Sequence, residues 1–269
     1  YISTSAKLQI GHPPGAPLYQ MMGAVFSLFA TSTEKIALAV NFLSVVSSAF
    51  VILFLFWSIT LLLRKIYDIS DKKSSTNIFL SAIIGSLAYT FSDSFWYNAV
   101  EAEVYALAMF FLAATFWLGL RWEKDFDTER GDKWLVLISF MIGLSFGVHF
   151  MAILTIPAIG MIYFFKQYKK ITIKNFLLAN IISVSILLFI FKLLLPSTLG
   201  FFGQLEVFFV NSIGLPFNSG TIIAAVLVVL FFYKALNYSR RKGNVNLNTL
   251  ILCTLFIFVG FSSWMMLPI

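Results

Sequence analysis

The sequence predicts an all-α protein that crosses a membrane several times, and three observations support this fold class. Hydrophobic residues make up 59% of the 269 residues, and charged residues only 12%. Several apolar runs reach the roughly 20 residues with which an α-helix crosses the hydrocarbon core of a bilayer. The period-two alternation of a membrane β-barrel is absent from these runs, so the spans are expected to be helices. We therefore expect one integral-membrane domain over residues 1–269, built as a polytopic helix bundle.

The apolar runs predict about eight spans. A shorter apolar segment, 18–31, is expected to lie along the membrane interface. Residues 134–165 could form one long tilted helix, but two short spans that meet near His149 agree better with the charge pattern. Gly143 and Gly147, four residues apart, are expected to let a neighbouring helix approach closely. The eight predicted spans are 36–63, 77–91, 104–121, 134–148, 150–165, 176–195, 221–238 and 249–266.

The basic residues indicate the orientation of these spans. All of the 19 Lys and Arg except Lys7, Lys35 and Lys192 fall in loops or at helix ends on one side of the predicted bundle. The positive-inside rule makes this side cytoplasmic. The net charge of +7 is therefore interpreted as membrane topology and not as a nucleic-acid surface. The single cysteine, Cys253, lies in an apolar run, so neither a disulfide nor a thiol metal site is expected.

The stretch LQIGHPPGAPLYQ, residues 8–20, precedes the first long span. Its three prolines fix φ and disfavour helix, and Gly11 and Gly15 permit tight turns or the close approach of a ligand. A stiff loop that bears His12 at the top of a helix bundle suits the binding of a phosphate or a sugar. A simple connector is the alternative, since Pro and Gly are common in loops.

The predicted non-cytoplasmic side has few ionisable side chains, and these are candidates for a functional site because such groups are costly near a membrane. Seven of the twelve acids lie on the cytoplasmic side, among basic residues in two loops, and are expected to be solvated. No ligand spacing such as H-x-x-x-H occurs, so no metal and no other cofactor is expected. The ionisable residues on the non-cytoplasmic side, apart from the lysines, are His12, Glu34, Asp93, Glu101, Glu103, His149 and Glu206.

The segment FSDSFWYNAVEAEVYAL, residues 91–107, is the richest of these candidates. On a helix that starts near Asn98, Glu101 and Tyr105 would share a face, and Glu103 would point elsewhere. Asn98 followed three residues later by Glu101 also resembles a capping box, in which Glu101 would bind backbone N–H groups. Both interpretations stay open on the sequence.

Three further candidates have alternatives of their own. Trp96 and the tyrosine after it could form a stacking floor for a ligand or an anchor in the membrane interface. Asp93 could belong to a site or to a turn. His149, at a predicted helix mouth, could act in a site or serve as a hydrogen-bonded packing residue.

Four motifs, LQIGHPPGAPLY, FWYNAVEAEVYAL, GLSFGVHF and GFSSWMMLPI, occur in an order that resembles the bacterial domain of unknown function 2723 (DUF2723) family. This family is related to protein O-mannosyltransferases and belongs with the GT-C type of membrane glycosyltransferases. The resemblance covers nearly the whole chain, and the first two motifs are its most specific parts. It implies an enzyme that transfers a sugar from a polyprenyl-phosphate carrier, often to Ser or Thr of a secreted protein. It also implies a bacterial inner membrane, with the site facing the periplasm.

The resemblance further implies where the site residues lie. The family's acidic catalytic residues are expected just before Tyr1, together with a first transmembrane helix, and the chain begins without a start Met. The general base is thus expected upstream, residues are expected to be missing at both ends, and the fragment alone is expected to be inactive. His12 and Glu101 would support catalysis. The residues expected to bind substrate are Lys7, His12, Gly15, Asp93, Trp96, Glu101, Glu103, Tyr105 and His149.

Two other classes of protein compete with a glycosyltransferase. A transporter or flippase of lipid-linked sugars should show polar residues along a path through the membrane. Only Lys192 is charged well within a predicted span, and it could snorkel outward. A non-catalytic assembly protein would explain the spans, but not the gathering of histidines and carboxylates on one side.

Overall fold

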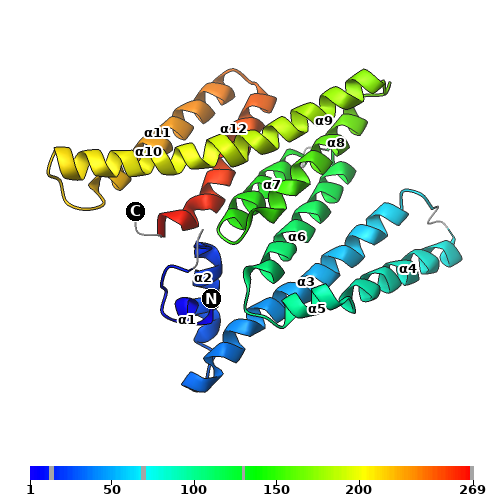
Figure 1. Ribbon diagram of the computed structural model, residues 1–269. Coiled ribbons are helices and arrows are strands. Elements are labelled where there is room, and N and C mark those ends of the chain that lie inside the picture. Colours follow the sequence, from blue (N-terminus) through cyan, green and yellow to red (C-terminus); the bar gives the residue numbers. More distant parts are fainter. Residues whose placement is uncertain (12–14, 68–70, 129–130, 267–269) are drawn as a thin grey trace. The chain divides into compact units, whose positions relative to one another are not determined.

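The computed structural model describes residues 1–11, 15–67, 71–128 and 131–266, and within these ranges the chain forms helices and no strand (Figure 1). The expected all-α, polytopic helix bundle is thereby confirmed. Contacts between residues divide the chain into two units. The first comprises Tyr1–Thr155 and the chain from Ile257, and the second comprises Ile156–Phe256.

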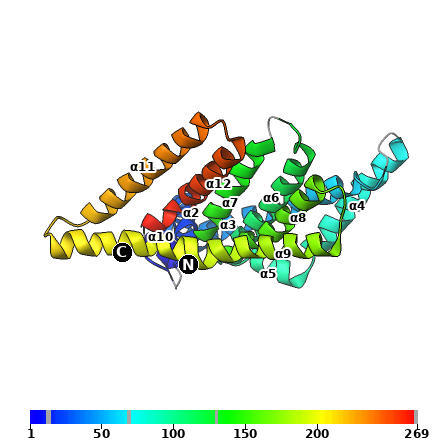
Figure 2. The same ribbon diagram turned by 90° about the horizontal axis from the view of Figure 1, so that it is seen from above.

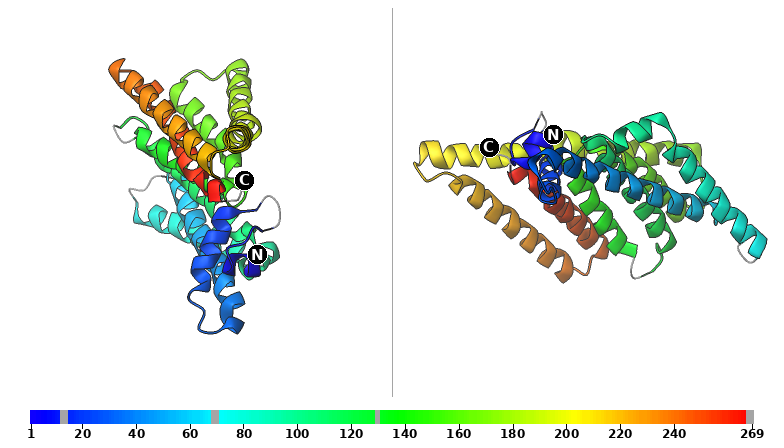
Figure 3. Two further views of the ribbon diagram at one scale, coloured as in Figure 1. Left: turned by 90° about the vertical axis from the view of Figure 1, so that its left-hand side faces the viewer. Right: turned by 90° about the horizontal axis from the view of Figure 1, so that it is seen from below.

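The first unit is built around α3 (Ile36–Leu63) and α6 (Val104–Lys124), which pack on each other. On the far side of α3 lies α4 (Lys72–Thr90), and on the far side of α6 lies α7 (Gly131–Phe146) (Figure 1). Beside the first half of α3 lie the short helix α1 (Ile2–Ala6) and α2 (Pro17–Ser27) (Figure 3). The remaining elements are η1 (Thr33–Lys35), α5 (Asp93–Ala99), the 3-10 helix η2 (Phe150–Leu154), the C-terminal turns of α12 (Val245–Phe261) and η5 (Ser262–Met266).

The helices α7 and α12 (Val245–Phe261) approach each other through glycines. A Cβ atom added at Gly143 would collide with the carbonyl oxygen of Ile257, and one added at Gly260 would meet the backbone of α7. Gly147 lies in the same way against Leu18 and Ser263. The prediction that Gly143 and Gly147 permit close packing is therefore confirmed.

The second unit contains α8 (Thr155–Gln167), α11 (Ser219–Arg241) and most of α12. Along the chain, one very long helix follows α8 and precedes α11 (Figure 2). This helix joins α9 (Ile173–Leu188), the π-helical turn η3 (Phe189–Leu194), α10 (Leu195–Val207) and a second π-helical turn, η4 (Phe208–Ser212). Its 40 residues extend over about 60 Å. The sequence prediction ended this span at residue 195. The helix continues because Pro196 follows a π-helical turn, where the regular i→i−4 bonding that proline disrupts is already interrupted.

Six helices of the described ranges are long and apolar enough to cross a membrane, and a seventh span results if α4 and α5 are one span bent by 71°. The sequence predicted about eight. The predicted span without a counterpart among these seven is 134–148, which corresponds to α7. This helix has 16 residues and extends about 24 Å, less than the roughly 30 Å of a hydrocarbon core. The chain breaks between α7 and η2 at His149, so residues 134–165 are not one long helix.

Some of the acids that were expected to be solvated have structural partners. Glu123 forms an ion pair with Lys65 and thereby joins the ends of α3 and α6. Asp125 accepts a hydrogen bond of 2.9 Å from the indole N–H of Trp134. Asp71 caps α4, where its side chain accepts hydrogen bonds from two backbone N–H groups. None of these three residues is buried, so they stay solvated as expected, and the partners add a structural role that the sequence did not show.

Glu206 has a structural role at the hairpin between α10 and α11. Its carboxylate accepts hydrogen bonds from the backbone N–H of Asn218 (2.6 Å) and from the N–H and hydroxyl of Thr221 (2.8 and 3.0 Å). A Cβ atom at Gly220 would collide with the backbone of Glu206, so the two helices touch at this point. An anion at the N-terminus of α11 satisfies N–H groups that have no partner within the helix.

The Glu206→Gln variant is expected to lower the melting temperature of the full-length protein by a few degrees. The amide retains only one accepting oxygen, so one of the bonded N–H groups at the start of α11 loses its acceptor. The measurement is thermal unfolding in detergent, with Glu34→Gln as the control, since Glu34 is exposed on η1. Equal melting temperatures for the two variants would contradict the assigned role of Glu206.

Candidate functional site

The start of α2 is fixed on the turn that follows α7. The backbone N–H groups of Leu18 and Tyr19 point at the carbonyl oxygen of Gly147, at 2.8 and 3.3 Å. Before them, Gly15 and Ala16 both have positive φ values, of 103° and 41°, and Pro17 begins the helix. Proline is well suited to this first helical position, and Gly15 is suited to the left-handed backbone before it. This local geometry places Tyr19 beside the turn that leads to His149.

A buried polar contact holds α1 against α2. The hydroxyl of Ser5 donates a hydrogen bond of 2.7 Å to the side-chain oxygen of Gln20. Gly23 allows this approach, because a Cβ atom there would collide with Ser5. Gly11 likewise leaves room for the side-chain amide of Gln20. The contact fixes α1, and with it the position of Tyr1.

Tyr1 and Tyr19 pack together where α1, α2 and the start of α6 share one apolar core, and the charge of Glu103 reaches both phenols. The ring of Tyr1 packs edge-on against that of Tyr19, with centroids 5.1 Å apart. Burial raises the pKa of Tyr1, and the nearby charge of Glu103 and then Tyr105 raise it further. Burial also raises the pKa of Tyr19; the Ser44 hydroxyl opposes this shift, and Glu103 adds to it. Both phenols therefore stay neutral and can donate hydrogen bonds.

His149 is linked to this group through Tyr105. Its ring lies 5.7 Å from that of Tyr105 and 5.2 Å from that of Phe150, centroid to centroid. Its backbone N–H donates to the carbonyl of Ser145 at 2.7 Å, and its Nδ1 is buried without a hydrogen-bond partner among the residues that the structure describes. Burial lowers the pKa of His149. The imidazole is thus a neutral hydrogen-bonding group, and not a positive charge, at pH 7.

The pKa of His149 in the full-length protein is expected to lie below the ordinary value of about 6.5. Because the unfolded chain would then bind more protons, the contribution of His149 to stability is complete above about pH 6.5 and is lost as the pH falls toward the folded pKa. The measurement is NMR of labelled histidine, in which the signal of this residue is identified by its loss in His149→Gln. A midpoint at or above about 6.5 would contradict the burial of its Nδ1.

These five residues, Tyr1, Tyr19, Glu103, Tyr105 and His149, are called the Glu103 cluster below. They combine one carboxylate, three phenol hydroxyls and a neutral imidazole, and Tyr1 and Tyr19 pack with the apolar core that includes Leu107 and Val148. Such a set both donates and accepts hydrogen bonds, as a ligand with several hydroxyl groups requires. In the described ranges, no group of three His, Cys, Asp or Glu side chains could hold a metal ion.

The helix predicted to start near Asn98 is not present. Asn98 lies inside α5, where its amide donates to the carbonyl of Ser94 at 2.8 Å, and Glu101 lies in the bend before α6. Glu101 and Tyr105 therefore do not share a helix face, and the predicted capping box is wrong. A tertiary contact accompanies the break, since the amide of Asn41 on α3 donates to the carbonyl of Val100 at 2.7 Å.

The other predicted site residues do not all lie in the Glu103 cluster. Glu103, expected to bind substrate but to point away from the face of Glu101 and Tyr105, lies near enough to Tyr1 and Tyr19 for its charge to raise the pKa of both phenols. Lys7 is exposed at the end of α1, and Gly15 is buried at the start of α2. His12 lies outside the described residues. Tyr1 and Tyr19 were missed from sequence; the available signal was a tyrosine two residues after the helix-starting Pro17, since a buried phenol usually needs a polar partner.

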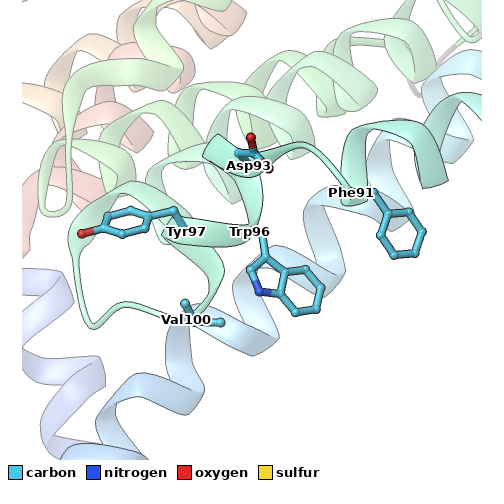
Figure 4. A pocket seen from close by; sticks show the side chains of 5 residues that line it. All are labelled: Phe91, Asp93, Trp96, Tyr97 and Val100. Atoms are coloured by element: carbon cyan, nitrogen blue, oxygen red, sulfur yellow. The ribbon is translucent and has the colours of Figure 1, made fainter.

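A second feature lies on the short helix α5. Asp93, Trp96, Tyr97 and Val100 follow the i, i+3, i+4, i+7 spacing of one helix face, and with Phe91 they line a pocket of about 440 Å³ (Figure 4). All five of these side chains are exposed. Asp93 and Trp96, two of the predicted site residues, thus lie on α5 outside the Glu103 cluster, with side chains that point in different directions (Figure 4).

The structure so far defines an integral-membrane helix bundle with a cluster of hydroxyl, carboxylate and imidazole groups at the start of α6. Residues 1–172 match the family model described as the protein O-mannosyl-transferase TMEM260 N-terminal domain, and the chain belongs to this family. The matched region contains every residue of the Glu103 cluster and of the α5 pocket.

One curated relative supports the same family. The protein O-mannosyl-transferase tmem260 of Dictyostelium discoideum is 22% identical over 160 residues, which cover 55% of this chain. The matched segment spans only 18% of that relative's length. No solved structure matches the chain. The expected relation to protein O-mannosyltransferases is confirmed at the level of the family; DUF2723 membership and the GT-C type stay predictions.

Proposed function

We propose that the chain is part of a membrane glycosyltransferase that moves a sugar from a polyprenyl-phosphate carrier to a Ser or Thr hydroxyl of a secreted or surface protein. The observation that supports this most strongly is the family match over residues 1–172, which includes the whole Glu103 cluster. The printed family name makes mannose the first sugar to test. The distribution of basic residues favours a site on the non-cytoplasmic side. A bacterial inner membrane, with the site facing the periplasm, is proposed from the resemblance to the DUF2723 family.

The proposed reaction is a displacement at the anomeric carbon of the sugar. The acceptor hydroxyl attacks this carbon, a carboxylate upstream of Tyr1 takes the hydroxyl proton, and the bond to the lipid phosphate breaks. The leaving lipid phosphate retains the bonding electrons, so donors that approach it stabilise the transition state. Tyr1 packs on Tyr19 beside Glu103, and a residue just before Tyr1 would therefore reach the same cluster.

The residues of the chain divide between the parts of this substrate. Glu103 and Tyr105 would bind sugar hydroxyls, with His149 as a neutral partner. Lys7, His12 and the backbone around Gly15 are proposed to bind the lipid phosphate, with His12 and Glu101 supporting catalysis. No metal or other cofactor is required by this scheme.

The test uses the full-length protein in a host that lacks its own copy. Secreted and surface proteins are digested, and hexose on Ser and Thr is measured by mass spectrometry. Expression should restore hexosylated peptides that are absent from cells with an empty vector. No such peptides from cells that contain the correctly inserted protein would overturn the proposed activity.

A further inference from the structure

The turn after α7 is held from outside by two other elements. A helix end leaves backbone carbonyls without partners in the helix, and here these are the carbonyls of residues 144–147. Two of them accept bonds from N–H groups of the turn itself, including that of His149. The carbonyl of Gly147 accepts from the start of α2. That of Phe146 accepts a hydrogen bond of 3.0 Å from the indole Nε1 of Trp264, a residue of η5 that lies 118 positions further along the chain.

A row of aromatic rings connects the same two places. The ring of Trp264 stacks on that of Phe261, with centroids 5.7 Å apart and planes inclined by 24°, and Phe261 meets Phe146 edge-on at 6.2 Å. From Phe146 the row continues through Phe150 to His149, with centroid distances of 6.3 and 5.2 Å. Close-packed side chains transmit strain to their neighbours. The rings from Trp264 to His149 therefore form one packed connection between η5 and the imidazole.

The elements η5 and α2 meet on Gly147. A Cβ atom added at this glycine would collide with Ser263 of η5 and with Leu18 of α2. The next residue of α2 is Tyr19, whose N–H also points at the carbonyl of Gly147. The turn therefore carries two members of the Glu103 cluster, Tyr19 through the contact with α2 and His149 through the chain itself, and η5 packs against the same turn.

We propose that Trp264 is a positioning residue for the Glu103 cluster. Its indole N–H fixes the carbonyl of Phe146 and with it the turn that places His149 and the start of α2. Trp264 acts through His149 and not on the substrate. The inference rests on the proposed function, and it gives a part in sugar transfer to the last of the four sequence motifs, which lies outside the matched region 1–172.

The experiment removes the N–H group and keeps an aromatic ring. Trp264→Phe can still stack on Phe261 but cannot donate to the carbonyl of Phe146. Wild type, Trp264→Phe, His149→Gln and the double variant are compared as full-length proteins in vesicles, with an acceptor identified in the host described above. Trp264→Phe should lower the transfer rate about five- to tenfold, since one hydrogen bond is lost. In the His149→Gln background the same substitution should change the rate by less than about twofold, because the two residues act together.

The NMR signal of His149 provides a second readout, which a packing role alone would not move. In Trp264→Phe the titration midpoint of His149 should rise toward about 6.5, because a loosened turn admits water to the buried Nδ1. Trp57→Phe is the matched control. It replaces an indole of α3 that packs on Trp117, away from the turn, and should leave both the rate and the midpoint unchanged.

A reciprocal measurement covers the case in which Trp264→Phe does not insert. The indole N–H signal of Trp264, labelled site-specifically, should shift between wild type and His149→Gln, because coupling between two sites acts in both directions.

Equal rate losses in the wild-type and His149→Gln backgrounds, with an unchanged midpoint, would overturn the inference and leave Trp264 a packing residue. So would an indole signal that is the same in wild type and His149→Gln. No transfer by wild type would instead contradict the proposed function, while the two NMR comparisons would still test whether Trp264 positions His149.

Discussion

Glu103→Gln is expected to lower sugar transfer by about 10- to 100-fold, because a hydrogen bond to a charged group contributes about 1.5–3 kcal/mol and each 1.4 kcal/mol is a factor of ten. The amide keeps the size of the side chain but loses the charge that lies beside Tyr1 and Tyr19. The measurement is the rate of label incorporation by the full-length protein in membranes, at matched protein levels.

The control for this variant is Glu34→Gln, which removes a carboxylate of the same type from an exposed position on η1. It should retain the wild-type rate. Equal rates for Glu103→Gln and Glu34→Gln, with both proteins correctly inserted, would remove Glu103 from the proposed site.

Gly143→Ala is expected to destabilise the full-length protein by about 1–3 kcal/mol, the usual range for overpacking. The added methyl group would collide with the carbonyl oxygen of Ile257, and it would lie 3.0 Å from the Cα atom of that residue. Backbone atoms of two packed helices cannot move aside as a flexible side chain can, so α7 and α12 must separate. Thermal unfolding in detergent measures the loss.

The matched control is Gly200→Ala in α10, where an added Cβ atom has nothing within 4 Å. This substitution should leave stability unchanged or raise it, since alanine favours a helix over glycine by about 1 kcal/mol. If Gly143→Ala unfolds at the same temperature as Gly200→Ala, the close approach of α7 and α12 is wrong.

Most helices could be predicted because the membrane imposes long apolar runs on the sequence. The run 36–63 matches α3 in full, and the run that begins at residue 104 matches the start of α6. The errors come from interactions that a local pattern does not contain. The end of α5 coincides with a hydrogen bond from Asn41 to Val100, 59 residues away in sequence. The long helix continues past Pro196 because a π-helical turn precedes the proline.

The candidate site was predictable to a similar extent. Glu103, Tyr105 and His149 were selected because ionisable and polar groups are rare at the predicted helix mouths, and the structure brings the rings of Tyr105 and His149 within 5.7 Å of each other. Tyr1 and Tyr19 were not selected, because their role depends on α1 being held to α2 by Ser5 and Gln20. Contacts between elements, and not composition, decide which polar residues share one site.

The central claim is that a lipid-linked sugar is transferred to a protein hydroxyl. The most direct measurement gives purified full-length protein in vesicles a labelled polyprenyl-phosphate mannose, or the corresponding nucleotide sugar, together with an acceptor found in the host experiment. The account predicts label on Ser or Thr from the lipid-linked donor and none from the nucleotide sugar. Transfer from the nucleotide sugar alone, or label that never leaves the lipid, would contradict it.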